Sequence, residues 1–418
     1  MKVSQFGRKM AVQSGIGQLM DDLGAALRDQ GNALMLGGGN PAHIGQVECH
    51  FRRSMMTLLQ QGNRFERAVG EYDPPEGNTA FIRAVATLLH EQFGWDIGPR
   101  NIALTHGSQS AFFILFNLFA GRFDDGTTKK VLFPLTPEYI GYCDVGLEPD
   151  LFASLKPWIE HLDEHLFKYR LDFERLEVTN EIGAICVSRP TNPSGNVLTN
   201  DELARLSDLA RAQGVPLIVD NAYGLPFPNI VFTEAEPLWN DNTIVCMSLS
   251  KLGLPGTRTG IVIASEEIAQ MVARVNAVMS LAPGSMGTAL ATELVRSGEI
   301  LRLGREVIKP FYESKAKQAL AHFREHLEGV DYRIHRPEGA FFLWLWLPDL
   351  PITSQQLYER LKARHVIVVP GHHFFPGLAE PWPHTHECLR VSYAQDDTVV
   401  ARGIAIIAEE IKHACHAT

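Results

Sequence analysis

The sequence predicts an α/β fold in which a mostly parallel, mixed sheet is sandwiched by helices, with a smaller α+β domain attached. Two observations predict this class. Between residues 130 and 264, short apolar runs typical of buried strands alternate with helical or loop segments, a pattern that favours a parallel sheet covered on both faces. The chain has 418 residues, which exceeds the size at which one hydrophobic core keeps growing.

The expected domain boundaries follow changes in this pattern. We place an N-terminal arm with part of the small domain at residues 1–48, a large domain at residues 49–298 and a C-terminal small domain at residues 299–418. Near residue 300 the alternation gives way to a long helical segment and a β-rich run. The sequence shows no internal repeat.

Composition excludes several classes of function. The 38 basic and 48 acidic residues give a net charge of −10, and no run of Lys or Arg exceeds a pair, which disfavours nucleic acids and anionic membranes as partners. The six cysteines show no Cys-x-x-Cys spacing, and several lie in apolar runs where a reduced thiol packs as a small hydrophobe. No window resembles a membrane span or a signal peptide. We therefore expect a soluble cytoplasmic protein.

The first segments contain one helix and a glycine-rich stretch. Residues 16–27 have the pattern of a short amphipathic helix that ends near Gly31. Residues 34–41 contain three consecutive glycines before Asn-Pro, which lets the backbone pass close to a ligand or another backbone. Neither the dinucleotide fingerprint nor the Walker spacing is present there, so these glycines do not predict a phosphate loop.

A turn and a strand–turn–helix unit follow. Residues 71–77 predict a Pro-Pro turn in which Tyr72 is either a contact residue or a surface cap. Residues 101–105 predict a strand, and after His-Gly-Ser-Gln an apolar helix occupies residues 110–119. A glycine turn between a strand and a helix aims backbone N–H groups and the positive helix end at an anion. Ser108 fits such a site or only caps the helix.

The central strands are predicted at residues 130–133, 184–188, 217–220, 243–248 and 260–264. The clearest helix among them, residues 201–213, begins with a capping box at Thr199. Ligands bind at the carboxyl ends of parallel strands. Just after those ends the sequence places Ser108, Tyr139, Asn192, Asp220, Tyr223 and Lys251. We therefore expect the functional site at this edge of the sheet.

The C-terminal part predicts a long helix, a β-rich run and a final helix. The long helix covers residues 301–327, with a bend at Pro310. The apolar run at residues 339–347 favours strands, and residues 401–412 favour a helix.

The stretch around Lys251 carries most of the predicted chemistry. A lysine at the end of an apolar strand is desolvated, which lowers the pKa of its amine and suits it to Schiff-base formation. The hydroxyls of Ser248 and Ser250 and the guanidinium of Arg258 suit a phosphate group, and a lysine beside a phosphate suggests pyridoxal phosphate (PLP). Ser248 to Lys251 also matches the Ser-x-x-Lys motif of β-lactamases, but the partner triplets Ser-Asp-Asn and Lys-Thr-Gly are absent from the sequence.

Motifs along nearly the whole chain resemble the class I and II aminotransferases of PLP fold type I. They are, in order, Tyr72 with Pro75 and Gly77, Gly107-Ser-Gln, Pro137-Glu-Tyr139, Pro190-Thr-Asn-Pro-Ser-Gly195, Asp220-Asn-Ala-Tyr223, Ser248-Leu-Ser-Lys251 with Arg258, and Leu389-Arg-Val-Ser-Tyr-Ala394. Each motif alone is weak evidence for this family, whereas the whole set in this order is strong evidence for it.

The resemblance implies a role for each motif residue. Lys251 would carry PLP and move a proton at the substrate, Asp220 would pair with the ring nitrogen, and Tyr139 would stack on the ring. Asn192 and Tyr223 would donate to the ring oxygen. The phosphate would be held by Gly107, Ser108, Gln109, Ser248 and Arg258, and by Tyr72 from a neighbouring subunit. Arg390 would bind the substrate carboxylate together with Asn192, and Gly39 would leave room for it. A homodimer is therefore expected.

Several of these residues have simpler interpretations. Asp220 could cap a turn, Asn192 could be a turn residue between prolines, and Arg390 could be a surface charge. Tyr142, three residues after Tyr139, could exchange roles with it.

The expected substrates are small neutral amino acids and 2-oxo acids. Dicarboxylate aminotransferases use a second arginine, and residues 279–286 contain none. An apolar pocket of this kind favours small neutral or branched side chains. The resemblance implies alanine and valine, with pyruvate and 2-oxoisovalerate, as the substrates. Other small neutral amino acids remain possible substrates, because one methylene changes transition-state binding by only about 1–3 kcal/mol. A C–S lyase or eliminase is the alternative reaction, and a PLP-sensing regulatory domain is a third, less favoured hypothesis.

One histidine-rich loop does not fit this scheme. His372, His373, His384 and His386 lie among prolines and aromatic residues, and the His-x-His spacing can bind a metal. No cysteine or carboxylate completes a site, so we predict no metal and a loop that lines the pocket or packs beneath it.

Overall fold

A computed structural model describes residues 2–11, 14–28 and 33–416. The main sheet has eight strands, and seven of them follow in the order β2-β11-β10-β9-β8-β4-β3, with β5 beside β4. Their bounds are Ile102–His106 (β2), Thr259–Ile263 (β11), Thr243–Ser248 (β10), Leu217–Asp220 (β9), Ile182–Ser188 (β8), Thr128–Phe133 (β4), Gly121–Arg122 (β3) and Phe152–Ser154 (β5). The strand pairs from β10 to β5 are parallel, whereas β11 and β3 pair antiparallel with their neighbours. The predicted mostly parallel, mixed sheet is confirmed.

A second sheet has six strands in the order β15-β16-β13-β12-β7-β6. Its strands are Val369–Pro370 (β15), Cys388–Ser392 (β16), Phe342–Trp346 (β13), Arg333–His335 (β12), Leu166–Arg170 (β7) and Trp158–His161 (β6). The middle of the chain thus supplies β6 and β7 to a sheet built mainly from C-terminal strands. β1 (Leu34–Met35) pairs in parallel with β14 (Val366–Ile367). The proposed division at residues 48 and 298 stays a prediction.

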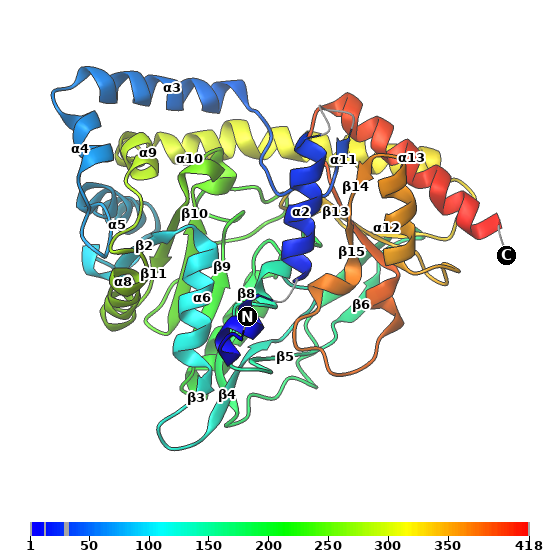
Figure 1. Ribbon diagram of the computed structural model, residues 1–418, viewed down its shortest axis with the longest axis horizontal. Helices are drawn as coiled ribbons and strands as arrows, with labels where there is room; N and C mark the ends of the chain where they lie inside the picture. Colours follow the sequence, from blue (N-terminus) through cyan, green and yellow to red (C-terminus); the bar gives the residue numbers. More distant parts are fainter. Residues whose placement is uncertain (1, 12–13, 29–32, 417–418) are drawn as a thin grey trace.

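The helices surround both sheets (Figure 1). They are α1 (Gln5–Met10), α2 (Gly15–Arg28), α3 (Gly45–Gln60), α4 (Arg64–Gly70), α5 (Thr79–Phe93), α6 (Ser108–Phe119), α7 (Asn200–Ala212), α8 (Glu266–Ser280), α9 (Met286–Arg296), α10 (Glu299–Leu303), α11 (Lys309–His326), α12 (Ser354–Ala363) and α13 (Asp397–His416). In Figure 1, α6 lies in front of the main sheet, and α11 runs along the top toward α13. None of the helices within the described ranges is both long and apolar enough to cross a bilayer.

Local sequence signals explain several helix boundaries. The Thr199 side chain accepts from the N–H of Glu202, whose carboxylate accepts in return from the N–H of Thr199, which confirms the predicted capping box. The predicted bend at Pro310 is preceded by a π-helical turn, Gly304–Ile308. Proline has no N–H to donate to the carbonyl four residues earlier, so the regular hydrogen-bond ladder cannot continue there.

Other boundaries differ from the predictions. Ser108 is the first residue of α6 and not its cap, because Gly107 occupies the N-cap position with φ of 79°. This is a left-handed conformation that glycine adopts without strain. The predicted end of the first amphipathic helix near Gly31 lies outside the described residues. α1, α3, α4, α8, α9 and α12 were not predicted.

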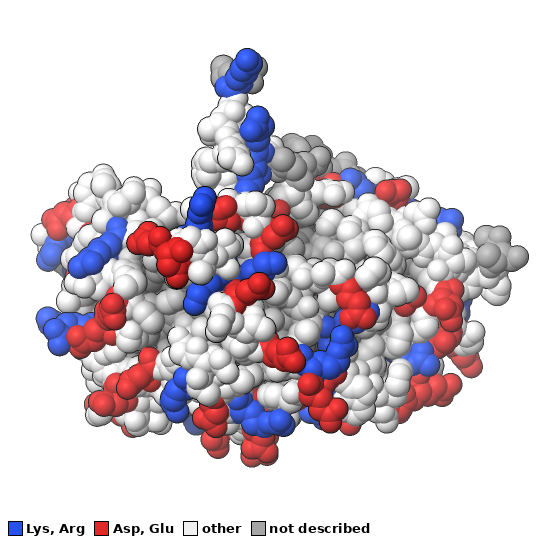
Figure 2. Space-filling view, turned by 90° about the horizontal axis from the view of Figure 1, so that it is seen from below, with Lys and Arg blue, Asp and Glu red and all other residues white. Residues whose placement is uncertain are grey.

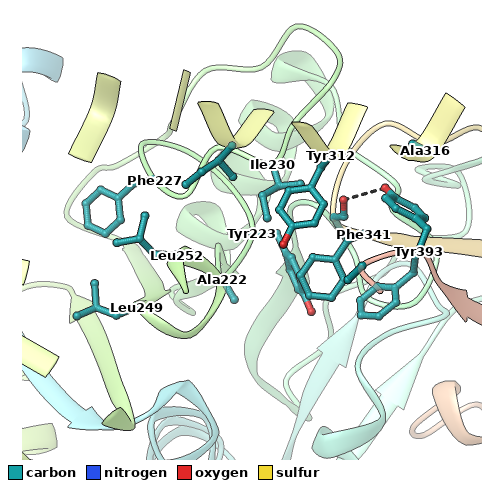
Figure 3. Close-up of a cluster of buried hydrophobic side chains, with 14 of the residues drawn as sticks. Ala222, Tyr223, Phe227, Ile230, Leu249, Leu252, Tyr312, Ala316, Phe341 and Tyr393 are labelled. Carbon is teal, nitrogen blue, oxygen red and sulfur yellow. Dashed lines mark hydrogen bonds between the residues drawn. The ribbon is translucent and has the colours of Figure 1, made fainter. Parts of the chain in front are cut away.

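The hydrophobic core joins the two sheets beside the predicted site. Figure 3 shows the rings of Tyr223, Tyr312 and Phe341 lying against one another. The Tyr312 and Phe341 rings stack with centroids 5.3 Å apart, and Phe341 meets Tyr223 edge-on at 5.2 Å. Tyr393 donates a 2.9 Å hydrogen bond to the Ala340 carbonyl. Burial of these aromatic side chains stabilises the walls around the site.

On the face shown in Figure 2, basic and acidic side chains alternate and do not gather into patches of one sign.

Candidate active site

A cavity of about 860 Å³ opens at the carboxyl ends of the central strands. It is lined by every predicted site residue except Gly107 and Tyr72: Gly39, Ser108, Gln109, Tyr139, Asn192, Asp220, Tyr223, Ser248, Lys251, Arg258 and Arg390. These residues come from seven separate stretches of the chain, so the fold brings together what the sequence only placed in order.

Lys251 lies in a single 3₁₀ turn, Ser250–Leu252, just after β10. Its Nζ donates a 2.7 Å hydrogen bond to the Gly39 carbonyl and lies 5.3 Å from the centre of the Tyr223 ring. Burial, assisted by the cationic side chain of Arg390, lowers the pKa of the Lys251 amine to about 8. A large neutral fraction near pH 7–8 makes this amine a usable nucleophile and base.

Asp220 ends β9 and is buried beneath the cavity. Its Oδ1 accepts from the Ala222 N–H at 2.9 Å, so it does form the turn contact considered for it. Its Oδ2 accepts a 2.5 Å hydrogen bond from the Tyr142 hydroxyl. The pKa of Asp220 is raised overall, because the effect of burial exceeds the opposing effects of the Tyr142 hydrogen bond and nearby Lys251.

The two tyrosines of the Pro-Glu-Tyr-Ile-Gly-Tyr stretch take different positions. Tyr139 lines the cavity, whereas Tyr142 is fully buried and does not. Their rings meet edge-on with centroids 5.3 Å apart. The contact between Tyr142 and Asp220 was missed from the sequence, although the spacing of the two tyrosines was a signal that both face one region.

An anion-binding corner lies at the N-terminus of α6. Helix N-termini leave backbone N–H groups without intrahelical partners, and here those are near Ser108 and Gln109. The Arg258 guanidinium packs directly against Gly107, where a Cβ atom would lie 2.1 Å from Nη2. Arg258 Nη1 also donates to the Ser250 hydroxyl at 3.4 Å. Because Gly107 has no side chain, the Arg258 guanidinium can approach the N-terminus of α6.

Ser248 closes this corner from β10. Its hydroxyl accepts from the Ser250 N–H at 3.0 Å and donates to the Thr259 carbonyl at 3.3 Å. Ser250, whose hydroxyl the sequence also suggested for a phosphate site, lines the cavity as well. Hydroxyl groups, backbone N–H groups and a guanidinium from residues that line the same cavity suit a phosphate group.

Arg390 is a buried cation without a carboxylate partner among the described residues. It lies in β16, only 2% exposed, so the surface-charge interpretation is wrong. Nη1 donates to Asn192 Oδ1 and Nη2 to the Gly37 carbonyl, each at 2.7 Å, while Nε has no partner. Burial lowers the pKa of Arg390 to about 10, and it remains charged near pH 7. Such a group favours an incoming anion.

Asn192 and Gly39 shape the space beside Arg390. Because Asn192 Oδ1 accepts from Arg390, its NH2 group is left to donate elsewhere. A Cβ on Gly39 would lie 3.6 Å from Lys251 Nζ and would fill part of the cavity.

Tyr72 is not in the cavity of the single chain. It lies between α4 and α5 with 82% of its surface exposed. Its predicted contribution to a neighbouring site stays a prediction.

The N-terminal helix supplies an apolar wall that the sequence did not reveal. Ile16, Leu19 and Met20 of α2, together with Met35, line the cavity. Asp22 anchors this helix because it accepts 2.5 Å hydrogen bonds from Tyr358 Oη and Lys362 Nζ of α12. The amphipathic pattern indicated an apolar face but not the surface that it covers.

The histidine-rich loop does not line the cavity. His384 is buried and lies 2.5 Å from the Tyr169 hydroxyl, which also accepts from Trp344 Nε1. His373 packs against Gly15 of α2. Within the described ranges, His322, Glu325 and His326 of α11 lie close enough to share a metal ion, and the loop histidines form no such group.

Comparison with known proteins agrees with this geometry. The family model described as aminotransferase class I and II matches residues 53–407. The chain is 55% identical over 414 residues to valine–pyruvate aminotransferase of Escherichia coli, covering 99% of both chains. The crystal structure of a putative amino-acid aminotransferase from Psychrobacter arcticum is 45% identical and superimposes with a TM-score of 0.97 over the full length of both chains.

A second solved structure, valine–pyruvate aminotransferase from Salmonella typhimurium, is 53% identical with a TM-score of 0.89, covering 96% of this chain and 100% of that one. The chain belongs to the aminotransferase class I and II family. It is a PLP-dependent transaminase with the fold of type I enzymes.

The residues present fit PLP. The corner at Gly107 can take a phosphate because it holds a guanidinium and a helix end against a position where no side chain fits. The pKa of the Lys251 amine is lowered to about 8, and the buried Asp220 carboxyl group lines the same cavity. The corner at Gly107 thus matches the phosphate of PLP, the Lys251 amine its aldehyde and the Asp220 carboxyl group its ring nitrogen.

Proposed function

We propose that this enzyme transfers an amino group between alanine and pyruvate on one side and valine and 2-oxoisovalerate on the other, in a ping-pong cycle. Two findings support these substrates: the high identity to valine–pyruvate aminotransferase over the full chain, and the apolar wall formed by Ile16, Leu19 and Met20. The arginines among the described lining residues are Arg258 and Arg390. Arg258 would bind the cofactor phosphate and Arg390 the substrate α-carboxylate, so neither is left to bind a second carboxylate on the substrate side chain.

PLP bound at Lys251 would supply an electron sink for the carbanion formed at the substrate Cα. The residues of the protein would bind and orient the cofactor. Asp220 would hold a positive charge on the ring nitrogen, and Tyr139 would pack on the ring face. Asn192 and Tyr223 would donate to the ring oxygen. Gly107, Ser108, Gln109, Ser248 and Arg258 would hold the phosphate.

Lys251 and Arg390 would act directly on the amino acid. Arg390 would bind its carboxylate through paired hydrogen bonds, with Asn192 holding the guanidinium in place. This orientation would present the Cα proton to Lys251, whose amine would remove it as a base. Gly39 would keep the space between them open.

We also propose a cytoplasmic homodimer. Support comes from large apolar side chains that the single chain leaves exposed: Met56, Leu59, Val69, Tyr72, Val278, Met279 and Leu281. Their elements, α3, α4, α8 and the following loops, lie toward the same end of the molecule in Figure 1, and such patches commonly mark interfaces. In a dimer Tyr72 would reach the phosphate of the partner. The six free cysteines suit a reducing compartment.

The substrate proposal is tested by the pairing of donors and acceptors. Purified enzyme with alanine and 2-oxoisovalerate should produce pyruvate and valine in equal amounts. Alanine alone should give pyruvate only in proportion to the enzyme. Continuous turnover of an amino acid without any 2-oxo acid would instead indicate the eliminase reaction, which the comparisons do not favour.

A further inference from the structure

Glu138 is a buried carboxyl group to which no role has been assigned above. It lies between β4 and Tyr139 and is 1% exposed. Its Oε1 accepts from the Ser188 N–H at 2.9 Å, and its Oε2 lies 2.5 Å from the Ser188 hydroxyl. Among the described residues no lysine, arginine or histidine forms an ion pair with it. An ionised carboxylate would therefore be buried without a counter-charge, which is costly.

Glu138 is linked to Asp220 through two hydroxyl groups. The Ser188 hydroxyl lies 3.4 Å from the Tyr142 hydroxyl, and Tyr142 donates at 2.5 Å to Asp220. We call these four residues the Glu138–Asp220 chain. Ser188 and Asp220 line the cavity, whereas Glu138 and Tyr142 lie behind it. Glu138 can thus influence Asp220 without touching a ligand.

Counting hydrogens distinguishes the two charge states of Glu138. The Tyr142 hydroxyl has one hydrogen, which goes to Asp220. If Glu138 is ionised, Ser188 must donate to it, and no hydrogen is left between Ser188 and Tyr142. If Glu138 is neutral, it donates to Ser188 and Ser188 donates to Tyr142. Every contact in the chain then carries a hydrogen, and all donors point toward Asp220.

The charges around Glu138 favour the neutral state. Burial raises the pKa of Glu138 to about 8; nearby Asp220 acts in the same direction, whereas the hydrogen bonds from Ser188 oppose the shift. The other titratable groups that face it are Tyr142 and Cys186, and burial raises the pKa of both well above their usual values, so both stay uncharged near pH 8. On the cavity side, Lys251 faces Asp220. On the loop side, the N–H of Glu138 donates a 2.8 Å hydrogen bond to the Phe374 carbonyl.

We propose that Glu138 is a positioning residue that works as a neutral acid, donating through Ser188 and Tyr142 so that Asp220 stays ionised toward the cofactor's ring nitrogen. The inference rests on the proposed role of Asp220. A Glu138→Gln variant distinguishes a neutral from an ionised Glu138, because glutamine can replace the hydrogen bonds of a neutral carboxylic acid but not those of a carboxylate. The amide NH2 would donate to Ser188 Oγ, and the amide oxygen would accept the Ser188 N–H.

Infrared difference spectroscopy of the holoenzyme tests the protonation state directly. Wild type minus Glu138→Gln should show the carbonyl stretch of a protonated carboxylic acid at pH 7, which disappears with a midpoint near pH 8. Glu387→Gln, which changes a carboxylate bonded to Trp346 outside the chain, should leave that band in place. Absence of the band at pH 6–7 would overturn the proposal, whether or not the protein transaminates.

Kinetics test the effect on the site. Glu138→Gln should keep kcat/KM at pH 7 within about threefold of wild type, whereas Glu138→Leu and Ser188→Ala should each lose about tenfold or more, since each removes a buried hydrogen bond. The pH dependence of the bound cofactor's absorbance in Glu138→Leu should differ from that in wild type. The melting temperature of the variant protein reports separately whether it folds. Equal losses in the glutamine and leucine variants would show that a carboxylate is required and contradict a neutral Glu138.

Discussion

The Tyr142 hydroxyl donates a 2.5 Å hydrogen bond to Asp220, which lines the cavity, whereas Tyr142 is fully buried behind it. Of the two tyrosines in the same turn, one thus faces the ligand space and the other supports the acidic group. The hydrogen bond counteracts burial, which by itself would raise the pKa of Asp220 and favour its neutral form.

Tyr142→Phe should therefore reduce catalysis without altering the shape of the cavity. Loss of a hydrogen bond to a charged group costs about 1.5–3 kcal/mol, so kcat/KM should fall roughly 10- to 100-fold and the pKa of Asp220 should rise. Steady-state kinetics and cofactor titration would measure this. Tyr139→Phe is the matched control, since it keeps the ring that lines the cavity. A larger loss in Tyr139→Phe would contradict the distinction.

Arg390→Lys should weaken amino-acid binding far more than its conserved charge suggests. Lysine cannot reproduce the guanidinium that contacts Asn192 and Gly37 at once. We expect KM for alanine and valine to rise by about two orders of magnitude, corresponding to about 2.7 kcal/mol. Arg364→Lys, which changes a pair with Glu409 on α13, is the control and should leave KM unchanged. An unchanged KM in Arg390→Lys would show that the substrate carboxylate binds elsewhere.

Gly107→Ala should lower affinity for PLP by displacing Arg258. The added Cβ would lie 2.1 Å from the guanidinium nitrogen, and the left-handed backbone adds strain of about 1 kcal/mol. Gly126→Ala has the same sign of φ but open space around it, so it isolates the strain. PLP dissociation constants and melting curves of both variants separate the two effects. Equal PLP affinities would contradict the assigned phosphate corner.

Capture of PLP by the cofactor-free protein should depend on pH through Lys251. Its lowered pKa of about 8 leaves more neutral amine than an ordinary lysine at neutral pH, by about 300-fold for a 2.5-unit difference. Because the neutral amine reacts, the rate should rise with pH up to about 8 and level above it. Stopped-flow absorbance would follow the reaction. A rate that keeps rising to pH 10 would show that Lys251 is not desolvated.

Leu19→Ala should shift preference among neutral amino acids. Leu19 is buried in the apolar wall from α2, and removing its isopropyl group enlarges the space for a side chain. One methylene is worth about 1–3 kcal/mol in such pockets, so kcat/KM for valine should fall relative to alanine. Leu147→Ala, at an exposed position, is the control. Unchanged ratios would place the substrate side chain against another wall.

The sequence predicted the parts of the site that depend on strand ends. Lys251 and Asp220 follow apolar strands, and parallel strands end at one edge of a sheet, so their convergence follows from pattern alone. The structure confirmed the central strands within about two residues of their predicted bounds. Arg390 could be placed only by resemblance, because nothing local distinguishes a buried strand arginine from an exposed one.

Other features depend on contacts that local sequence cannot specify. The apolar face of α2 is visible in the sequence, but its position over the cavity depends on Asp22 reaching Tyr358, more than 300 positions away. The pairing of β7 with β12 likewise joins segments that are distant in sequence. Glu138 carries no sequence signal of burial, because a glutamate between Pro137 and Tyr139 is usually expected to be solvated.

The central claim is that Lys251 carries the cofactor, and chemical reduction followed by peptide mass analysis tests it most directly. Reduction of the holoenzyme should fix the cofactor's mass on the peptide that contains Lys251 and on no other lysine. Lys251→Ala should acquire no such mass and should form no pyruvate from alanine. Label on a different lysine, or normal pyruvate formation by Lys251→Ala, would contradict the account.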